Sequence, residues 1–86
     1  MKVKAKCYRD LRLHDKTGCA AISFYSGEVY IFDVSEKKLC DGLVTYKEYS
    51  ISMPQEGIIG HPLAKVTLYD RYFYRCYHLK DFFLLV

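Results

Sequence analysis

The stretch SFYSGEVYIFDV, Ser23–Val34, decides the fold. A turn signal at Ser26-Gly27 precedes a run of β-branched, aromatic and acidic residues, and β-branched and aromatic side chains favour strands. Successive side chains of a strand point to opposite faces. One face therefore holds Tyr30, Phe32 and Val34, and the other holds Val29 and Ile31. Apolar residues on both faces predict a central strand, or one that crosses between two sheets at a barrel corner.

The N-terminal segment Lys2–Leu13 alternates with a period of two, which predicts a half-buried strand. The pattern breaks at Arg9-Asp10, where we expect a bulge or a bend. The apolar face holds Val3, Ala5, Cys7, Leu11 and Leu13. The polar face carries three lysines at alternate positions: Lys2, Lys4 and Lys6.

Short apolar runs at 19–25, 43–53, 63–70 and 71–79 also favour strands, and the final KDFFLLV predicts a tight turn before a terminal strand. The segment Ser35–Gly42 admits two interpretations. Ser35 is a good N-cap and Gly42 a plausible C-cap for a short helix, whereas Asp41-Gly42 is a preferred pair for a tight hairpin turn. We therefore predict an all-β fold, a small antiparallel barrel of five to six short strands with at most one short helix.

The length and composition of the chain indicate one small domain covering residues 1–86. The chain is 51% hydrophobic and 27% charged, which is typical of globular proteins. Its formal charge of +3 excludes an acidic mimic of DNA. We see neither a signal peptide nor an apolar run long enough to span a bilayer, so we expect a cytoplasmic protein without a membrane partner. In that compartment the four cysteines are expected to be free thiols.

Three short motifs resemble a group of small bacterial and phage proteins, mostly uncharacterised. They are Ala5-Lys6-Cys7, the glycine-x-x-Tyr-x-apolar strand Gly27–Phe32, and a closing segment of the type Tyr-x-x-x-x-Phe-x-x-Val in Tyr77–Val86. The resemblance implies a barrel of the Src-homology-3 type, in which a 3₁₀ turn precedes a last strand that pairs with the first. In such a barrel Gly27 would make the sharp turn into the sheet, since glycine tolerates positive φ.

Catalytic and metal-binding motifs are missing from the sequence. We find no nucleophile elbow, no glycine-rich phosphate loop and no Cys-x-x-Cys pair. Cys76 and His78 are two residues apart, so on a strand they would share a face, but a structural zinc site normally needs a second close pair. We therefore expect a protein that is not an enzyme and that carries no metal and no cofactor.

Two sets of residues are candidates for binding. For a protein interface we expect a contact surface built from the loop Pro54–Pro62, the region Tyr69–Tyr77 and the segment Ser35–Gly42. Apolar anchors would come from Ile58 and Ile59, and aromatic and guanidinium contacts from Tyr72, Tyr74, Arg71 and Arg75. For nucleic acid the candidates are Lys2, Lys4, Lys6, Arg71 and Arg75, because cations beside aromatic rings hold single strands.

The sequence as a whole indicates a non-enzymatic macromolecule-binding module of a phage or mobile element. Its partner would be a host protein, such as a defence nuclease that it inhibits or modifies in the manner of an anti-CRISPR protein. This step rests on the resemblance and on association, not on chemistry. One alternative is a small nucleic-acid-binding barrel. Another is a self-associating component of a virion or assembly.

Overall fold

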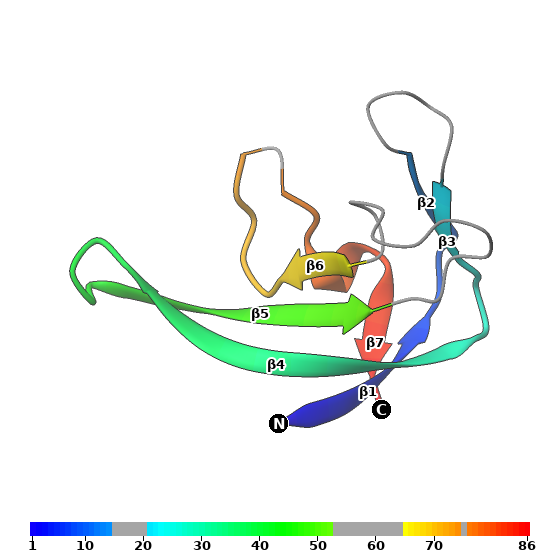
Figure 1. The fold of residues 1–86 in the computed structure, drawn as a ribbon, viewed down its shortest axis with the longest axis horizontal. Coiled ribbons are helices and arrows are strands. Elements are labelled where there is room, and N and C mark those ends of the chain that lie inside the picture. The colour runs from blue at the N-terminus through cyan, green and yellow to red at the C-terminus, as the bar shows by residue number, and fades with distance from the viewer. Residues whose placement is uncertain (15–20, 53–64, 75) are drawn as a thin grey trace.

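The structure is a computed structural model that describes residues 1–14, 21–52, 65–74 and 76–86. These residues form seven strands and one 3₁₀ turn (Figure 1). In chain order the elements are β1 (Lys2–Cys7), β2 (Leu11–His14), β3 (Ala21–Phe24), β4 (Val29–Leu39), β5 (Val44–Ser52), β6 (Lys65–Tyr69), η2 (Leu79–Asp81) and β7 (Phe83–Leu85).

Five of the strands form one antiparallel sheet in the order β6-β5-β4-β1-β7, while β2 pairs with β3. The sheet curls into a half-barrel, which confirms the predicted small all-β barrel. As expected, the 3₁₀ turn η2 precedes β7, and β7 pairs with β1. The strand count is higher than predicted because the expected bend near Arg9-Asp10 separates β1 from β2, which belongs to the second sheet.

Gly27 makes the turn that leads into β4. Its φ is +95°, which residues with a Cβ rarely adopt, and its N–H donates to the Cys7 carbonyl at 2.7 Å. No atom lies within 4 Å of the position that a Cβ would occupy. Backbone conformation, and not lack of space, is therefore the reason for a glycine here.

The core centres on three phenylalanines from three strands. The Phe83 ring of β7 meets Phe24 of β3 and Phe32 of β4 edge to face, with centroids 5.3 and 5.2 Å apart. All three are almost completely buried, and the two sheets are joined through them. The other buried residues are Ala5, Cys7, Leu11, Leu13, Ile22, Tyr49, Val66, Leu68 and Leu79.

One part of the prediction for β4 is wrong. β4 is indeed a central strand, between β5 and β1, and its inward residue Phe32 is buried. However, Val29 and Ile31 on the other face are 51% and 53% exposed. The reason is that the core lies on one side of the curled sheet only, so the outer face of β4 remains open.

The segment Ser35–Gly42 is a hairpin, so the helical alternative is wrong. β4 continues to Leu39, and the chain reverses through Cys40–Leu43, where the Leu43 N–H donates to the Cys40 carbonyl at 3.1 Å. Cys40, Asp41 and Gly42 have positive φ of 55°, 55° and 88°. Asp-Gly is a preferred pair in tight hairpin turns because aspartate and glycine accept positive φ more readily than most residues.

The strand predicted over 71–79 is also wrong. β6 ends at Tyr69, and the described residues between Asp70 and Tyr77 form no strand. Asp70 ends the ladder with β5: its N–H donates to the Lys47 carbonyl at 3.2 Å, and its Oδ1 accepts from the Lys47 N–H at 2.9 Å.

Candidate functional site

The β4–β5 hairpin extends beyond the rest of the sheet as an arm, residues 35–47. β1 pairs with β4 only as far as Asp33, and β6 pairs with β5 only up to Glu48. Beyond these points β4 and β5 pair with each other alone, out to Leu39 and Val44. Figure 1 shows the arm projecting away from the end that holds β2 and β3. The molecule is accordingly elongated, with extents of 42 × 27 × 23 Å.

The arm reverses the usual distribution of apolar side chains. Near the core, the inner face of the sheet carries buried Phe32 and Tyr49. The same face of the arm carries only polar residues: Glu36, Lys38, Thr45 and Lys47. The outer face of the arm instead carries Leu39 and Tyr46. Leu39 and Tyr46 therefore lie on the opposite face of the ribbon from Phe32 and Tyr49.

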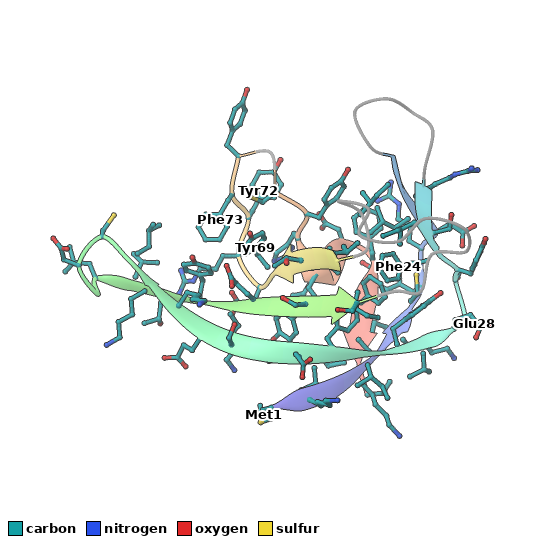
Figure 2. The ribbon with its side chains drawn as sticks, viewed as in Figure 1. Met1, Phe24, Glu28, Tyr69, Tyr72 and Phe73 are labelled. Atoms are coloured by element: carbon teal, nitrogen blue, oxygen red, sulfur yellow. The ribbon has the colours of Figure 1, made fainter. Side chains whose placement is uncertain are left out.

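A second aromatic cluster covers this outer face. The Tyr46 ring lies 6.0 Å from that of Tyr69 and 5.2 Å from that of Phe73, and Tyr69 and Phe73 are 5.6 Å apart, centroid to centroid. Figure 2 shows Tyr69 and Phe73 above the β4–β5 ribbon, away from Phe24. Tyr69 is half-buried, and this burial raises the pKa of its hydroxyl.

An apolar hollow of about 260 Å³ opens beside this cluster. It is lined by Leu39, Tyr46, Tyr69, Phe73 and Cys76. A smaller polar hollow of about 120 Å³ is lined by Tyr46, by Asp70 and Arg71, and by Glu36, Thr45 and Lys47 of the other face of the arm. Tyr46 lines both hollows, so an apolar recess and a charged one adjoin where the arm meets the segment after β6.

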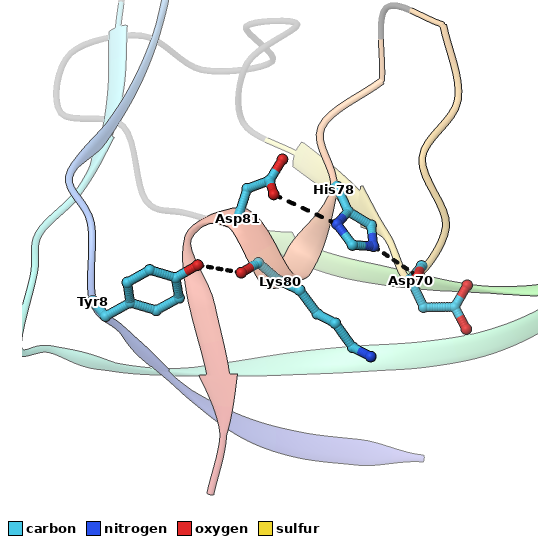
Figure 3. A network of polar contacts seen from close by, with 5 residues as sticks. All are labelled: Tyr8, Asp70, His78, Lys80 and Asp81. Atoms are coloured by element: carbon cyan, nitrogen blue, oxygen red, sulfur yellow. Dashed lines mark hydrogen bonds and ion pairs between the residues drawn. The ribbon is translucent and has the colours of Figure 1, made fainter.

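The segment after β6 is held at both ends (Figure 3). At its start Asp70 binds the Lys47 backbone. At its end the Tyr77 carbonyl accepts from the Tyr69 N–H at 3.0 Å, and the His78 Nε2 donates to the Asp70 carbonyl at 2.8 Å. The other ring nitrogen, Nδ1, lies 3.7 Å from the Asp81 carboxylate. Tyr8 adds a hydrogen bond from its hydroxyl to the Lys80 carbonyl. These bonds hold the backbone on both sides of the aromatic residues Tyr72 and Phe73 and thereby limit where their side chains can lie.

The predicted protein-binding residues are partly brought together. Arg71, Tyr72 and Tyr74 follow one another on this segment, and the side chains of Tyr72 and Tyr74 are 77% and 84% exposed. Ile58, Ile59 and Arg75 lie outside the described residues. Leu39 lies in Ser35–Gly42, which was predicted as part of the contact surface, whereas Leu43 and Tyr46 were not predicted. The Asp-Gly pair with leucines close on both sides is a signal for an exposed hairpin tip.

The described members of the predicted nucleic-acid set lie on different elements of the sheet, and Arg75 lies outside the described residues. Lys2, Lys4 and Lys6 are exposed on β1, whereas Arg71 follows the end of β6, and β4 and β5 lie between these strands. Neighbouring strands of a sheet lie about 4.8 Å apart, and β1 and β6 are three such intervals apart in the strand order. Lysines on a strand often guard an open edge, but β1 is paired on both sides, with β4 and with β7.

The thiols and the histidine do not gather into a reactive centre within the described residues. Cys7, Cys40 and Cys76 are free thiols, as expected, and Cys19 lies outside those residues. Burial raises the pKa of Cys7, whose Sγ donates to the Arg9 carbonyl at 3.0 Å. Cys76 and His78 do not share a strand, and the His78 ring turns toward Asp70. In the described ranges no three His, Cys, Asp or Glu side chains are grouped so as to hold a metal.

Comparison of the chain with models of known protein families, with curated proteins and with solved structures finds no match. Among the residues that the structure describes, no helix is long and apolar enough to cross a membrane.

Proposed function

We propose that this protein is a non-enzymatic module that acts by binding another protein through the arm and the segment 69–76. The observation that carries this proposal is the exposure of large apolar side chains around the apolar hollow. Leu43 at the tip of the arm is 86% exposed, and Tyr72 is 77% exposed. Tyrosine is enriched among the residues that dominate interface energetics, and an exposed apolar patch with a polar rim is typical of recognition surfaces.

The shape of the surface supports a protein partner. The hollow beside Tyr46 is lined by side chains held in place by ring contacts and by the Asp70 and His78 hydrogen bonds. A pocket that is already formed loses less conformational entropy on binding than a mobile one. An apolar side chain of the partner would fill the hollow, while Leu43 and Tyr72 would contact the partner on either side.

The setting of the partner is part of the same proposal. The resemblance of the three sequence motifs to small bacterial and phage proteins supports a host protein in the bacterial cytoplasm, such as a defence nuclease that the module inhibits or modifies. The nucleic-acid alternative has less support, because its lysines lie on β1 whereas Arg71 follows the end of β6, and β4 and β5 lie between these two strands.

The test is capture of partners from a bacterial host lysate treated with nuclease, at low and high salt. The immobilised proteins are the wild type, Leu43→Asp, Tyr72→Ala and the matched control Tyr25→Ala. Tyr25 is also exposed but lies between β3 and Gly27, away from the arm. We expect one stoichiometric protein that survives high salt and is reduced at least tenfold by the first two changes alone, since a hot-spot residue contributes more than about 1.4 kcal/mol.

Three outcomes would contradict the proposal. Equal loss in Tyr25→Ala would mean that the arm is not the contact surface. Recovery of nucleic acid alone, lost at high salt, would favour the nucleic-acid alternative, because affinity for phosphates falls as counterions compete. A stable homo-oligomer that depends on Leu43 would favour the assembly component.

A further inference from the structure

A second exposed surface lies on the outer face of β1 and its two neighbouring strands. Lys6 is paired with Val29 of β4 on one side and with Leu84 of β7 on the other, and Lys4 is paired with Ile31. Paired residues point to the same face of a sheet. We call this surface the lysine face: Lys2, Lys4, Lys6, Val29, Ile31 and Leu84.

The aliphatic side chains of the lysine face are about half exposed: 51% for Val29, 53% for Ile31 and 59% for Leu84. Two ordinary explanations for such residues fail here. The lysines do not guard a sheet edge, because β1 is paired on both sides. The aliphatic residues do not form a core, because the core lies on the opposite face of the same strands.

The chemistry of the lysine face restricts what can cover it. Lys2 is paired with Asp33, whereas Lys4 and Lys6 have aliphatic cross-strand partners, so three lysines face one carboxylate among these paired positions. A second copy packed face to face would bring lysines against lysines, which repel. A phosphate backbone would use the lysines but would leave Val29 and Ile31 in contact with nothing apolar. A partner must therefore offer both negative charge and apolar side chains.

We propose that the lysine face binds an acidic polypeptide segment that also carries apolar side chains, in extended form. Lys4 and Lys6 are two residues apart on a strand, which places them about 6.7 Å from each other. Alternate side chains of an extended segment have the same spacing, so two carboxylates could meet the two lysines in register. Apolar residues of that segment would then cover Val29, Ile31 and Leu84. The lysine face includes no residue of the arm, so the test of this site and the test of the proposed function can fail independently of each other.

The experiment is selection from a random peptide display library against the wild-type protein and against the double variant Lys4→Glu/Lys6→Glu. We expect the wild type to enrich peptides that contain acidic and apolar residues together, and the double variant to lose them. The affinity of a selected peptide, measured by fluorescence anisotropy, should fall at least tenfold in the double variant and in Ile31→Asp. It should change less than threefold in Lys4→Arg and in Arg12→Glu, which reverses an exposed charge on β2, outside both proposed surfaces.

Other results would overturn the inference. One is enrichment of peptides without acidic residues. Another is tight binding of acidic peptides by the double variant, provided that its circular dichroism matches the wild type. In the same assay, vesicles of phosphatidylcholine with phosphatidylserine and a single-stranded oligonucleotide serve as probes. If either binds through Lys4 and Lys6 while no acidic peptide is selected, the partner is a lipid surface or a nucleic acid and the inference is wrong.

Discussion

Replacement of Phe83 by leucine tests whether ring contacts hold the two sheets together. Phe83 is 1% exposed, and its ring meets Phe24, Phe32 and Tyr30 edge to face, at centroid distances of 5.3, 5.2 and 5.9 Å. Leucine keeps most of the apolar volume, so it leaves only a small cavity. What it removes is three edge-to-face contacts, each of which stabilises by about 0.5–1.5 kcal/mol beyond burial.

The expected loss of stability follows from those contacts. Their simple sum is about 1.5–4.5 kcal/mol, and because they share one ring we expect a loss near the lower end, about 2 kcal/mol. An 86-residue protein has a total stability of about 4–13 kcal/mol, so the variant should still fold. Urea denaturation should show the reduced free energy of unfolding, and the melting temperature should fall by about 8–16 °C.

Phe82→Leu is the matched control one residue away. Phe82 is only half-buried; its ring contacts Tyr77 at 6.3 Å and the Arg9 guanidinium at 5.5 Å. We expect a loss below about 1 kcal/mol, because exposed cation–π contacts contribute little. The reasoning is refuted if Phe83→Leu costs less than about 0.5 kcal/mol, or if Phe82→Leu costs as much as Phe83→Leu.

Two further predictions concern Asp70 and Tyr49. Asp70→Ala removes the acceptor for the Lys47 N–H, so hydrogen exchange of the Lys47 amide should accelerate at least fivefold, which corresponds to about 1 kcal/mol for one hydrogen bond. Asp70→Asn keeps an acceptor oxygen, so in this control the Lys47 amide should still exchange slowly. Equal exchange rates in both variants would show that the bond does not hold this end of β5. Burial raises the pKa of Tyr49 above its ordinary value of 10.0, with a smaller contribution from Asp70. The folded state therefore holds this proton more tightly than the unfolded state, so the resulting stability is fully present below pH 10 and is lost as the pH rises through the folded-state pKa, at up to about 1.4 kcal/mol per pH unit. Tyr49→Phe cannot ionise and should show a shallower fall in unfolding free energy above pH 10, and an identical alkaline profile in both proteins would contradict the assignment.

Much of the fold could be predicted from local pattern. The alternation in Lys2–Cys7 gives the inward and outward faces of β1 correctly, and the position of Gly27 predicts the turn that its φ of +95° confirms. The closing segment gives the turn and terminal strand at Leu79–Leu85. These features depend on neighbours in the chain, which is why periodicity and turn residues are enough to find them.

The candidate site was predicted only in part. Tyr72 and Tyr74 were predicted as contact residues, and the structure shows both exposed. The strand assigned to them was wrong: β6 ends at Tyr69, and the Asp70 carboxylate accepts from the Lys47 N–H of β5. No sequence pattern predicts that the rings of Tyr46 and Phe73, which are far apart in the chain, lie with their centroids 5.2 Å apart. Residue type indicated a binding surface, while long-range contacts decided where it lies.

The sequence by itself determined a small all-β protein, the faces of its first strand, its glycine turn and its closing strand, because these follow from alternation and from backbone preference. Only the tertiary structure decided that Ser35–Gly42 is the tip of a hairpin arm, that the arm turns its apolar side away from the core, and that Val29 and Ile31 remain open to solvent. The physical reason is that an alternating pattern says which residues share a face of a strand. Which of the two faces is covered depends on how the sheet curls and on which distant segments pack against it.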